Sequence, residues 1–238
     1  MNIPEDSSPV LVIAAHPDDE TLGCGATMAK LAAAGREVHV LFVATGVAGR
    51  YPDPGNHTQA IVDQVAVLRQ DAARAGQILG VASQTFLDFP DNRLDTVPLM
   101  DLAHSLKRQV LAIRPNVVFT HHFGDYNWDH GRVHEASLMA CRANPGEFYP
   151  QRLYAYEVLS STERAPAVPS RAFMPNIFVE ISATLETKIE ALRQYASELG
   201  VYPHPRSPEA VRHLAGRRGS TVGMRQAEAF QLLRELHW

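Results

Sequence analysis

The chain has 238 residues, of which 45% are apolar and 20% charged, an ordinary globular composition that can bury a large core. The formal net charge of −4 gives no electrostatic reason to expect a nucleic acid or an anionic membrane as a partner. No apolar run reaches the roughly 20 residues that a membrane span needs. The two cysteines, Cys24 and Cys141, cannot build a disulfide framework, so we expect reduced thiols in a cytoplasmic protein.

The first part of the chain predicts a β–α–β unit. Residues 10–15 form a continuous apolar run rich in β-branched side chains, which is typical of a strand buried on both faces. We expect a polar loop over residues 16–25, an alanine-rich helix over 26–34 and a second strand over 38–43. Two strands joined by a helix imply a parallel pair with a right-handed crossover.

The same alternation continues to about residue 145. Its pattern predicts helices over 59–79 and 97–113, strands over 85–87 and 116–120, and a helix from about 131 to 143. Alternating strands and helices favour an α/β, Rossmann-like fold, with a mostly parallel open sheet and helices on both faces. We expect one domain over residues 1–238, with its core at about 8–145.

The regular alternation of strands and helices ends near Pro150. Strands are predicted over 152–159 and 177–181, and a helix capped by Ser182 is predicted to run to about residue 199. Two shorter helices are predicted over 208–215 and 221–236. We interpret residues 150–238 as a C-terminal extension packed on the core.

One imidazole and three carboxylates follow the first predicted strand, in the segment His16-Pro17-Asp18-Asp19-Glu20. Ligands of open α/β sheets bind beyond the carboxyl ends of the strands. So much negative charge within five residues is costly unless a positive charge offsets it, and a divalent cation would do so. Imidazole with carboxylate suits zinc. The alternative is a solvated loop whose acidic side chain caps the next helix.

A second source of ligands follows the fourth predicted strand. If a helix begins near Asp129, His130 lies in its first turn and His134 lies one turn further on the same face. A single histidine in such a place is more often structural than a ligand. A catalytic zinc usually has three protein ligands, however, and this segment should reach the same sheet edge as His16. The sequence therefore favours a metal site.

These two segments resemble the PIG-L/LmbE family of zinc-dependent N-deacetylases. Members carry Ala-His-Pro-Asp-Asp-Glu after strand one, which is intact here as residues 15–20, and His-x-x-His after strand four. Softer similarity extends the resemblance over roughly the first 140 residues. The resemblance implies that His16, Asp19 and His130 bind Zn²⁺, or another divalent metal, and that Asp18 is the general base.

One position departs from the family pattern, because Asn127 replaces the first histidine of His-x-x-His. In the family this histidine is thought to stabilise the developing oxyanion or to protonate the leaving amine. Asn127 can donate a hydrogen bond to an oxyanion, but it cannot act as an acid. We therefore expect the proton to come from His134, from His122 or from a water held by Asp125.

Polar loops at the other strand ends are expected to hold the substrate. The candidates are Arg50 after the second strand, Asp91 and Asn92 after the third, and Asp125 and Trp128 after the fourth. The indole of Trp128 can stack on a sugar ring, although loop aromatics usually serve packing. Further along the chain, Arg206, Arg217 and Arg218 are expected to be solvated or paired with acidic neighbours.

The sequence thus predicts a zinc-dependent hydrolase that removes an N-acetyl group from an amino sugar or amino-sugar conjugate. Two alternatives stay open: a zinc amidohydrolase of a non-sugar N-acyl compound, and a catalytically impaired protein that binds metal and sugar, which Asn127 favours. A nucleotide-binding protein is disfavoured, because residues 23–25 lack the Gly-x-Gly-x-x-Gly pattern. The expected partner is a small N-acetylated amino sugar, with neither nucleic acid nor membrane, and the resemblance is compatible with a homo-oligomer.

Overall fold

The computed structural model describes residues 7–51 and 58–237. Within them, one seven-stranded sheet has the order β3-β2-β1-β4-β5-β7-β6. Strands β1 to β5 run parallel to one another, and β7 is antiparallel to both β5 and β6. The predicted fold class, a mostly parallel Rossmann-like sheet, is confirmed. The strands are β1 Val10–Ala14, β2 Val38–Ala44, β3 Ser83–Phe89, β4 Val117–His121, β5 Arg152–Tyr156, β6 Ile177–Glu180 and β7 Ala227–Glu235.

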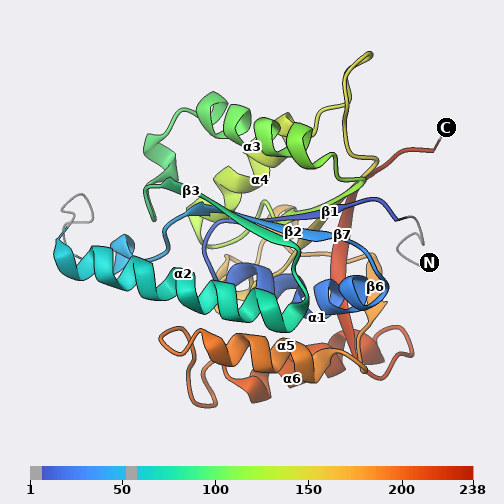
Figure 1. Ribbon diagram of the computed structural model, residues 1–238. Coiled ribbons are helices and arrows are strands. Elements are labelled where there is room, and N and C mark those ends of the chain that lie inside the picture. Colours follow the sequence, from blue (N-terminus) through green and yellow to red (C-terminus); the bar gives the residue numbers. More distant parts are fainter. Residues whose placement is uncertain (1–6, 52–57, 238) are drawn as a thin grey trace.

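Helices cover both faces of the sheet (Figure 1). Helices α3 and α4 lie on one face, and α1, α2, α5 and α6 lie on the other. Alternate residues of β1 enter the two cores, Val10 and Val12 on one side and Leu11 and Ile13 on the other, which explains its uninterrupted apolar run. The helices are α1 Asp19–Ala33, α2 Gln59–Leu79, α3 Leu99–Ile113, α4 Trp128–Ala140, α5 Leu185–Gln194 and α6 Pro208–Ser220.

The prediction of a helix over residues 221–236 is wrong. This segment contains β7, which pairs with β5 on one side and β6 on the other. Its alanine, glutamate, leucine and glutamine residues favour helix when considered alone. Tertiary packing overrides that preference: Phe230 is fully buried, and its ring lies 5.0 Å from Phe119 and 6.4 Å from Tyr154.

Several helix boundaries also differ from those predicted, most of all in α5 and α1. The helix expected from Ser182 to about residue 199 is α5, which spans only Leu185–Gln194. Its N-cap is Thr184 and not Ser182, and Tyr195 at its end has left the helical conformation. Helix α1 begins at Asp19, whereas the sequence predicted a loop as far as residue 25. Cys24 has non-helical dihedral angles and kinks α1. The glycines on either side of Cys24 favour a loop in the sequence, so the first turns of this helix were not predicted. Gly23 is required by packing, because a Cβ there would lie 2.2 Å from the Tyr156 ring.

A buried ion pair from the C-terminal part holds the kink. Both carboxylate oxygens of Glu228 accept hydrogen bonds from α1, at 3.1 Å from the backbone nitrogen of Ala26 and 2.7 Å from that of Thr27. The ammonium group of Lys188 lies 2.6 Å from Glu228 and 2.8 Å from the carbonyl of Leu22. The backbone groups that the kink leaves unpaired therefore find partners on β7 and α5.

Among the described helices, none combines the length and apolar character needed to cross a bilayer.

Replacing Glu228 by alanine is expected to lower the free energy of unfolding by about 3–5 kcal/mol, because Lys188 would keep a buried, unpaired charge. Urea denaturation measures this. The matched control is Glu186→Ala, which breaks an exposed ion pair to Arg212 and should cost at most about 1 kcal/mol. Equal losses in the two variants would contradict the role assigned to Glu228.

Candidate active site

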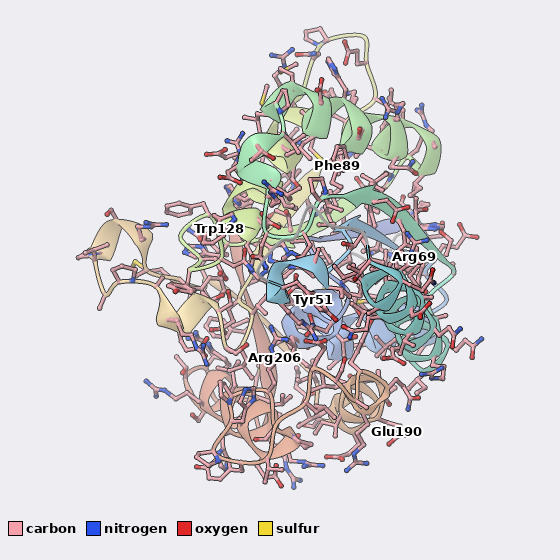
Figure 2. All side chains as sticks on the ribbon, turned by 90° about the vertical axis from the view of Figure 1, so that its left-hand side faces the viewer. Tyr51, Arg69, Phe89, Trp128, Glu190 and Arg206 are labelled. Atoms are coloured by element: carbon pink, nitrogen blue, oxygen red, sulfur yellow. The ribbon has the colours of Figure 1, made fainter. Side chains whose placement is uncertain are left out.

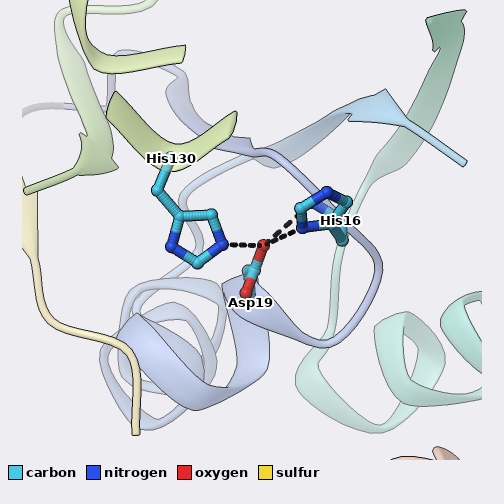
Figure 3. Close-up of side chains that lie close together, drawn as sticks. All are labelled: His16, Asp19 and His130. Atoms are coloured by element: carbon cyan, nitrogen blue, oxygen red, sulfur yellow. Dashed lines mark hydrogen bonds and ion pairs between the residues drawn. The ribbon is translucent and has the colours of Figure 1, made fainter. Parts of the chain in front are cut away.

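The three expected metal ligands meet at the carboxyl edge of β1 and β4 (Figure 3). His16 follows β1, Asp19 opens α1, and His130 is the third residue of α4. The Oδ2 atom of Asp19 lies 3.3 Å from Nδ1 of His16 and 3.2 Å from Nε2 of His130. One atom from each residue lies within 4.8 Å of the others, so the three can share one ion.

The other ring nitrogen of His16 is held by two buried carboxylates. Its Nε2 lies 3.0 Å from Oδ1 of Asp91 and 3.1 Å from Oδ2 of Asp129. Asp129 also accepts hydrogen bonds from the backbone nitrogens of Asn92 and Leu94, and Asp91 accepts one from that of Gly49. Metal-binding histidines usually carry such a carboxylate on the outer nitrogen, which fixes the ring and its tautomer.

His16, Asp91 and Asp129 also form a second group of possible ligands. Backbone amides and the outer nitrogen of His16 already occupy the oxygens of its two carboxylates. We therefore assign this group to the support of His16 rather than to a separate ion.

His130 has the same kind of support. Its Nδ1 lies 3.2 Å from Oδ1 of Asp125, and the ring of His121 stacks on its own ring with centroids 3.9 Å apart. Asp125 is held in turn by the hydroxyls of Ser161 and Thr162. Burial lowers the pKa of His130, but the carboxylates of Asp19 and Asp125 outweigh it and raise the pKa to about 9. Burial raises the pKa of Asp125, and the charge of His130 reverses this and lowers it to about 2.

These residues fit a divalent cation. Two imidazole nitrogens and one carboxylate oxygen are a donor set that catalytic zinc sites use. Four buried carboxylates, those of Asp19, Asp91, Asp125 and Asp129, surround the two imidazoles. The carboxylates outnumber the imidazoles even when both rings are protonated, so the cluster has negative charge for a cation to offset.

The carboxylate of Asp18 has a different partner from that of its neighbour Asp19. Its φ of 109° is rare for a non-glycine residue, and its backbone nitrogen donates to Oε2 of Glu20 at 3.0 Å. The hydroxyl of Tyr195 holds Glu20 from the opposite side at 2.7 Å. The Oδ2 atom of Asp18 accepts a hydrogen bond of 2.6 Å from Arg206. Burial raises the pKa of Asp18 well above its usual range, and the Arg206 cation opposes that shift.

A polar cavity of about 400 Å³ opens over the cluster. Figure 2 shows Trp128 and Arg206, both of which line the cavity, on one face of the molecule. Of the residues predicted for ligand binding, catalysis or substrate contact, those that line it are His16, Asp18, Arg50, Asp91, Asn92, Asn127, Trp128 and His130. Asp91 is only 3% exposed and reaches the cavity mainly as a partner of His16.

Four predicted residues do not line the cavity: Asp19, Asp125, His122 and His134. Asp125, expected at the substrate, lies behind His130 with its oxygens occupied by protein donors. His134, expected to supply a proton, is buried one helical turn below His130, and its Nδ1 donates to the carbonyl of His121 at 2.8 Å. His122 likewise uses Nε2 on the carbonyl of Arg171. The i, i+4 spacing predicted that His134 shares a face of α4 with His130, but His134 is buried and does not reach the cavity.

Sequence reasoning missed other residues at the site. Arg206, expected only to be solvated or paired with an acidic neighbour, contacts Asp18 across 188 positions of the chain. Tyr195 reaches Glu20 from the end of α5. Neither belongs to a local motif. Asp129 was within reach of sequence reasoning, because it adjoins a predicted ligand and metal-bound histidines favour a carboxylate partner.

Comparison with known proteins identifies the family of the chain. The model of the PIG-L family, described as GlcNAc-PI de-N-acetylase, matches residues 11–141, a range that includes all three expected ligands. The chain belongs to the PIG-L family. It is thus a hydrolase of the deacetylase and amidase class that acts on C–N bonds other than peptide bonds, as the resemblance of its motifs implied.

Relatives span most of the chain. It is 31% identical over 194 residues to the uncharacterized deacetylase YaiS of Escherichia coli, covering 79% of this chain and 90% of that protein. It is 29% identical over 207 residues to a 1D-myo-inositol 2-acetamido-2-deoxy-alpha-D-glucopyranoside deacetylase of Mycolicibacterium vanbaalenii, covering 75% and 69%. The conserved protein TT1542 of Thermus thermophilus superposes with a TM-score of 0.73 at 27% identity, covering 97% of each chain.

Metal binding should depend on pH with a definite sign. Below its pKa of about 9, His130 carries a proton that a metal ion must displace. Zinc affinity should therefore fall at least about tenfold for each pH unit between about pH 8 and pH 6. Titration against a chromogenic chelator measures this affinity, and calorimetry in buffers of different ionisation enthalpy counts the protons released. A pH-independent affinity without proton release would contradict the assignment of His130.

Proposed function

We propose that this protein is a zinc-dependent deacetylase that removes the acetyl group from a 2-acetamido sugar or a conjugate of one. The observation that carries the proposal is the placement of Asp18. It lines the same cavity as His16 and His130, and its carboxylate is bonded to Arg206 rather than to either imidazole. A separate base beside a metal cluster is the arrangement that hydrolysis requires. The name of the relative from M. vanbaalenii supports a 2-acetamido sugar as the substrate class.

His16, Asp19 and His130 would hold the ion. When bound there, zinc would polarise the amide carbonyl and acidify a water molecule. Asp18 takes a proton from the water as the new C–O bond forms at the acetyl carbon. The protonated Asp18 then gives that proton to the sugar nitrogen as the C–N bond breaks, which releases acetate and the free amine. This return of the proton needs no second acid, in keeping with the positions of His134 and His122 outside the cavity.

Asn127 has a defined orientation for the role of oxyanion donor. It caps α4, and its Oδ1 accepts a hydrogen bond from the backbone nitrogen of Asp129 at 2.9 Å. Its Nδ2 is therefore the free end of the amide, with no hydrogen bond to another described residue. Asn127 lines the cavity, so Nδ2 can donate to the acetyl oxygen as negative charge develops there.

We expect residues at the rim of the cavity to bind the sugar. Tyr126 and Trp128 are 61% and 55% exposed there, unusually so for large aromatic side chains. The indole nitrogen of Trp128 donates to the backbone carbonyl of Asn92 at 3.0 Å, which fixes the ring. A fixed, exposed aromatic face suits the apolar face of a pyranose, and the side chains of Arg50 and Asn92 offer hydrogen bonds to its hydroxyls.

The proposal is tested by acetate release from N-acetyl amino sugars, their inositol and other glycosides, and N-acetyl amino acids, with zinc-loaded protein and a chelated control. Chelator-sensitive release from the sugars is the expected result. Release only from the amino acids would replace the sugar by a non-sugar amide. Zinc binding without release from any compound would instead favour an impaired binding protein.

Asp18→Asn should keep zinc and lose turnover, by roughly 10²- to 10⁴-fold in kcat, because it removes the base and leaves the three ligands in place. Metal analysis and the acetate assay read the two effects separately. Asp63→Asn, on the exposed face of α2, is the control and should retain full activity. Full activity in Asp18→Asn would show that another group takes the proton.

A further inference from the structure

Arg206 joins the C-terminal part of the chain to the proposed base. It lies in the loop between α5 and α6 and lines the active-site cavity (Figure 2). Its Nη1 donates to Oδ2 of Asp18 at 2.6 Å and to Oε2 of Glu198 at 3.2 Å. Its Nε donates to the hydroxyl of Ser160 at 2.6 Å. Two carboxylates and a hydroxyl thus fix the guanidinium group within the cavity wall.

The loop that carries Arg206 is itself well anchored. Ser207 is fully buried and caps α6, accepting a hydrogen bond from the backbone nitrogen of Ala210 at 3.1 Å. The backbone nitrogen of Arg206 donates to the ring of His204 at 3.1 Å. Glu198 is also paired with Arg50 on the opposite side. The guanidinium is therefore in place before any substrate arrives.

The two carboxylate oxygens of Asp18 have different surroundings. Oδ2 is bonded to Arg206, whereas Oδ1 has no hydrogen-bond partner among the described residues. The backbone at Asp18 has a φ of 109°, so neighbouring groups must hold the residue in a conformation that it would not adopt alone. Glu20 holds its backbone nitrogen, and Arg206 is the group that holds its side chain.

We infer that Arg206 is a positioning residue for hydrolysis: it fixes the Asp18 carboxylate through Oδ2 and leaves Oδ1 free to take the proton of the attacking water. The inference rests on the proposed role of Asp18 as base. Recognition of an anionic group on the substrate is a poorer use of this arginine, because two protein carboxylates already neutralise it. Arg206 contacts Asp18 through one nitrogen and one oxygen, and this single short hydrogen bond is enough to orient the carboxylate.

The kinetic test compares zinc-loaded full-length wild type with Arg206→Gln and Arg206→Lys. The glutamine variant should lose roughly 10- to 100-fold in kcat, with little change in KM and in zinc content. Lysine keeps the charge with a different donor geometry and should recover part of the loss. The control is Arg212→Gln, which removes an exposed arginine that bonds Glu186 across α5 and α6 and should leave kcat unchanged. An unchanged kcat in Arg206→Gln, or a loss confined to KM, would overturn the inference.

A second measurement needs no substrate. Crystal structures of the zinc-loaded wild type and Arg206→Gln should show the Asp18 carboxylate displaced in the variant, with His16, Asp19 and His130 unmoved. An Asp18 carboxylate that keeps its position would overturn the inference even if the wild type releases no acetate, so failure of the proposed function is recognised separately. If Arg206→Gln does not fold, Arg206→Lys serves both measurements, with a smaller kcat loss and a smaller displacement expected.

Discussion

The site is governed by the concentration of negative charge at the carboxyl edge of β1 and β4. Carboxylates removed from water are stable only where a cation or several hydrogen bonds compensate them. Here the compensation differs from one residue to the next: Asp129 has backbone amides, Asp125 has hydroxyls, Asp18 has a guanidinium, and Asp19 has two imidazoles. Asp19 and its two imidazoles are the group that we predict to hold an ion. The distribution of partners thus distinguishes the acids compensated by the protein from the predicted metal site.

Several side chains at the site use their two polar atoms differently: one atom is bonded to the protein, and the other faces the cluster or has no partner in the described part of the chain. His16 and His130, the two imidazoles predicted to bind metal, each have one nitrogen near Asp19 and the other near a second carboxylate. Asp18 likewise bonds Arg206 through one oxygen, and its other oxygen has no partner among the described residues. Groups with two polar atoms can be held rigidly by one atom and remain available at the other. Asn127 follows the same logic, with its oxygen on a helix amide and its nitrogen left to donate. Rigid placement of the reacting atoms lowers the reorganisation that the reaction would otherwise need.

The sequence predicted most of what is local. The strand at β1 and the limits of α2 depend on neighbours within a few residues, and the structure agrees with both predictions. His16 and Asp19, predicted from one local motif, lie 3.3 Å apart, and their role as ligands stays a prediction. The start of α1 was missed because glycines beside Cys24 resemble a loop, and β7 was missed because its helix-favouring residues are held by strands far away in the sequence. The same limit applies to the site. Arg206 and Tyr195 reach Asp18 and Glu20 from distant segments, and no spacing rule connects them.

The strand order β5-β7-β6 has a consequence for how the chain reaches this state. During synthesis the ribosome releases β1 to β5, with both ligand-bearing segments, well before β7 can enter the sheet between β5 and β6. Until then the kink in α1 lacks its partner on Glu228. Arg206 also belongs to the C-terminal part of the chain, so Asp18 gains that partner only after β1 to β5 have been made. A nascent chain can gather histidines and acids at the sheet edge early, but the geometry around Asp18 waits for the last elements to dock. The residues predicted to bind metal therefore leave the ribosome before the groups that hold the Asp18 side chain and the kink in α1.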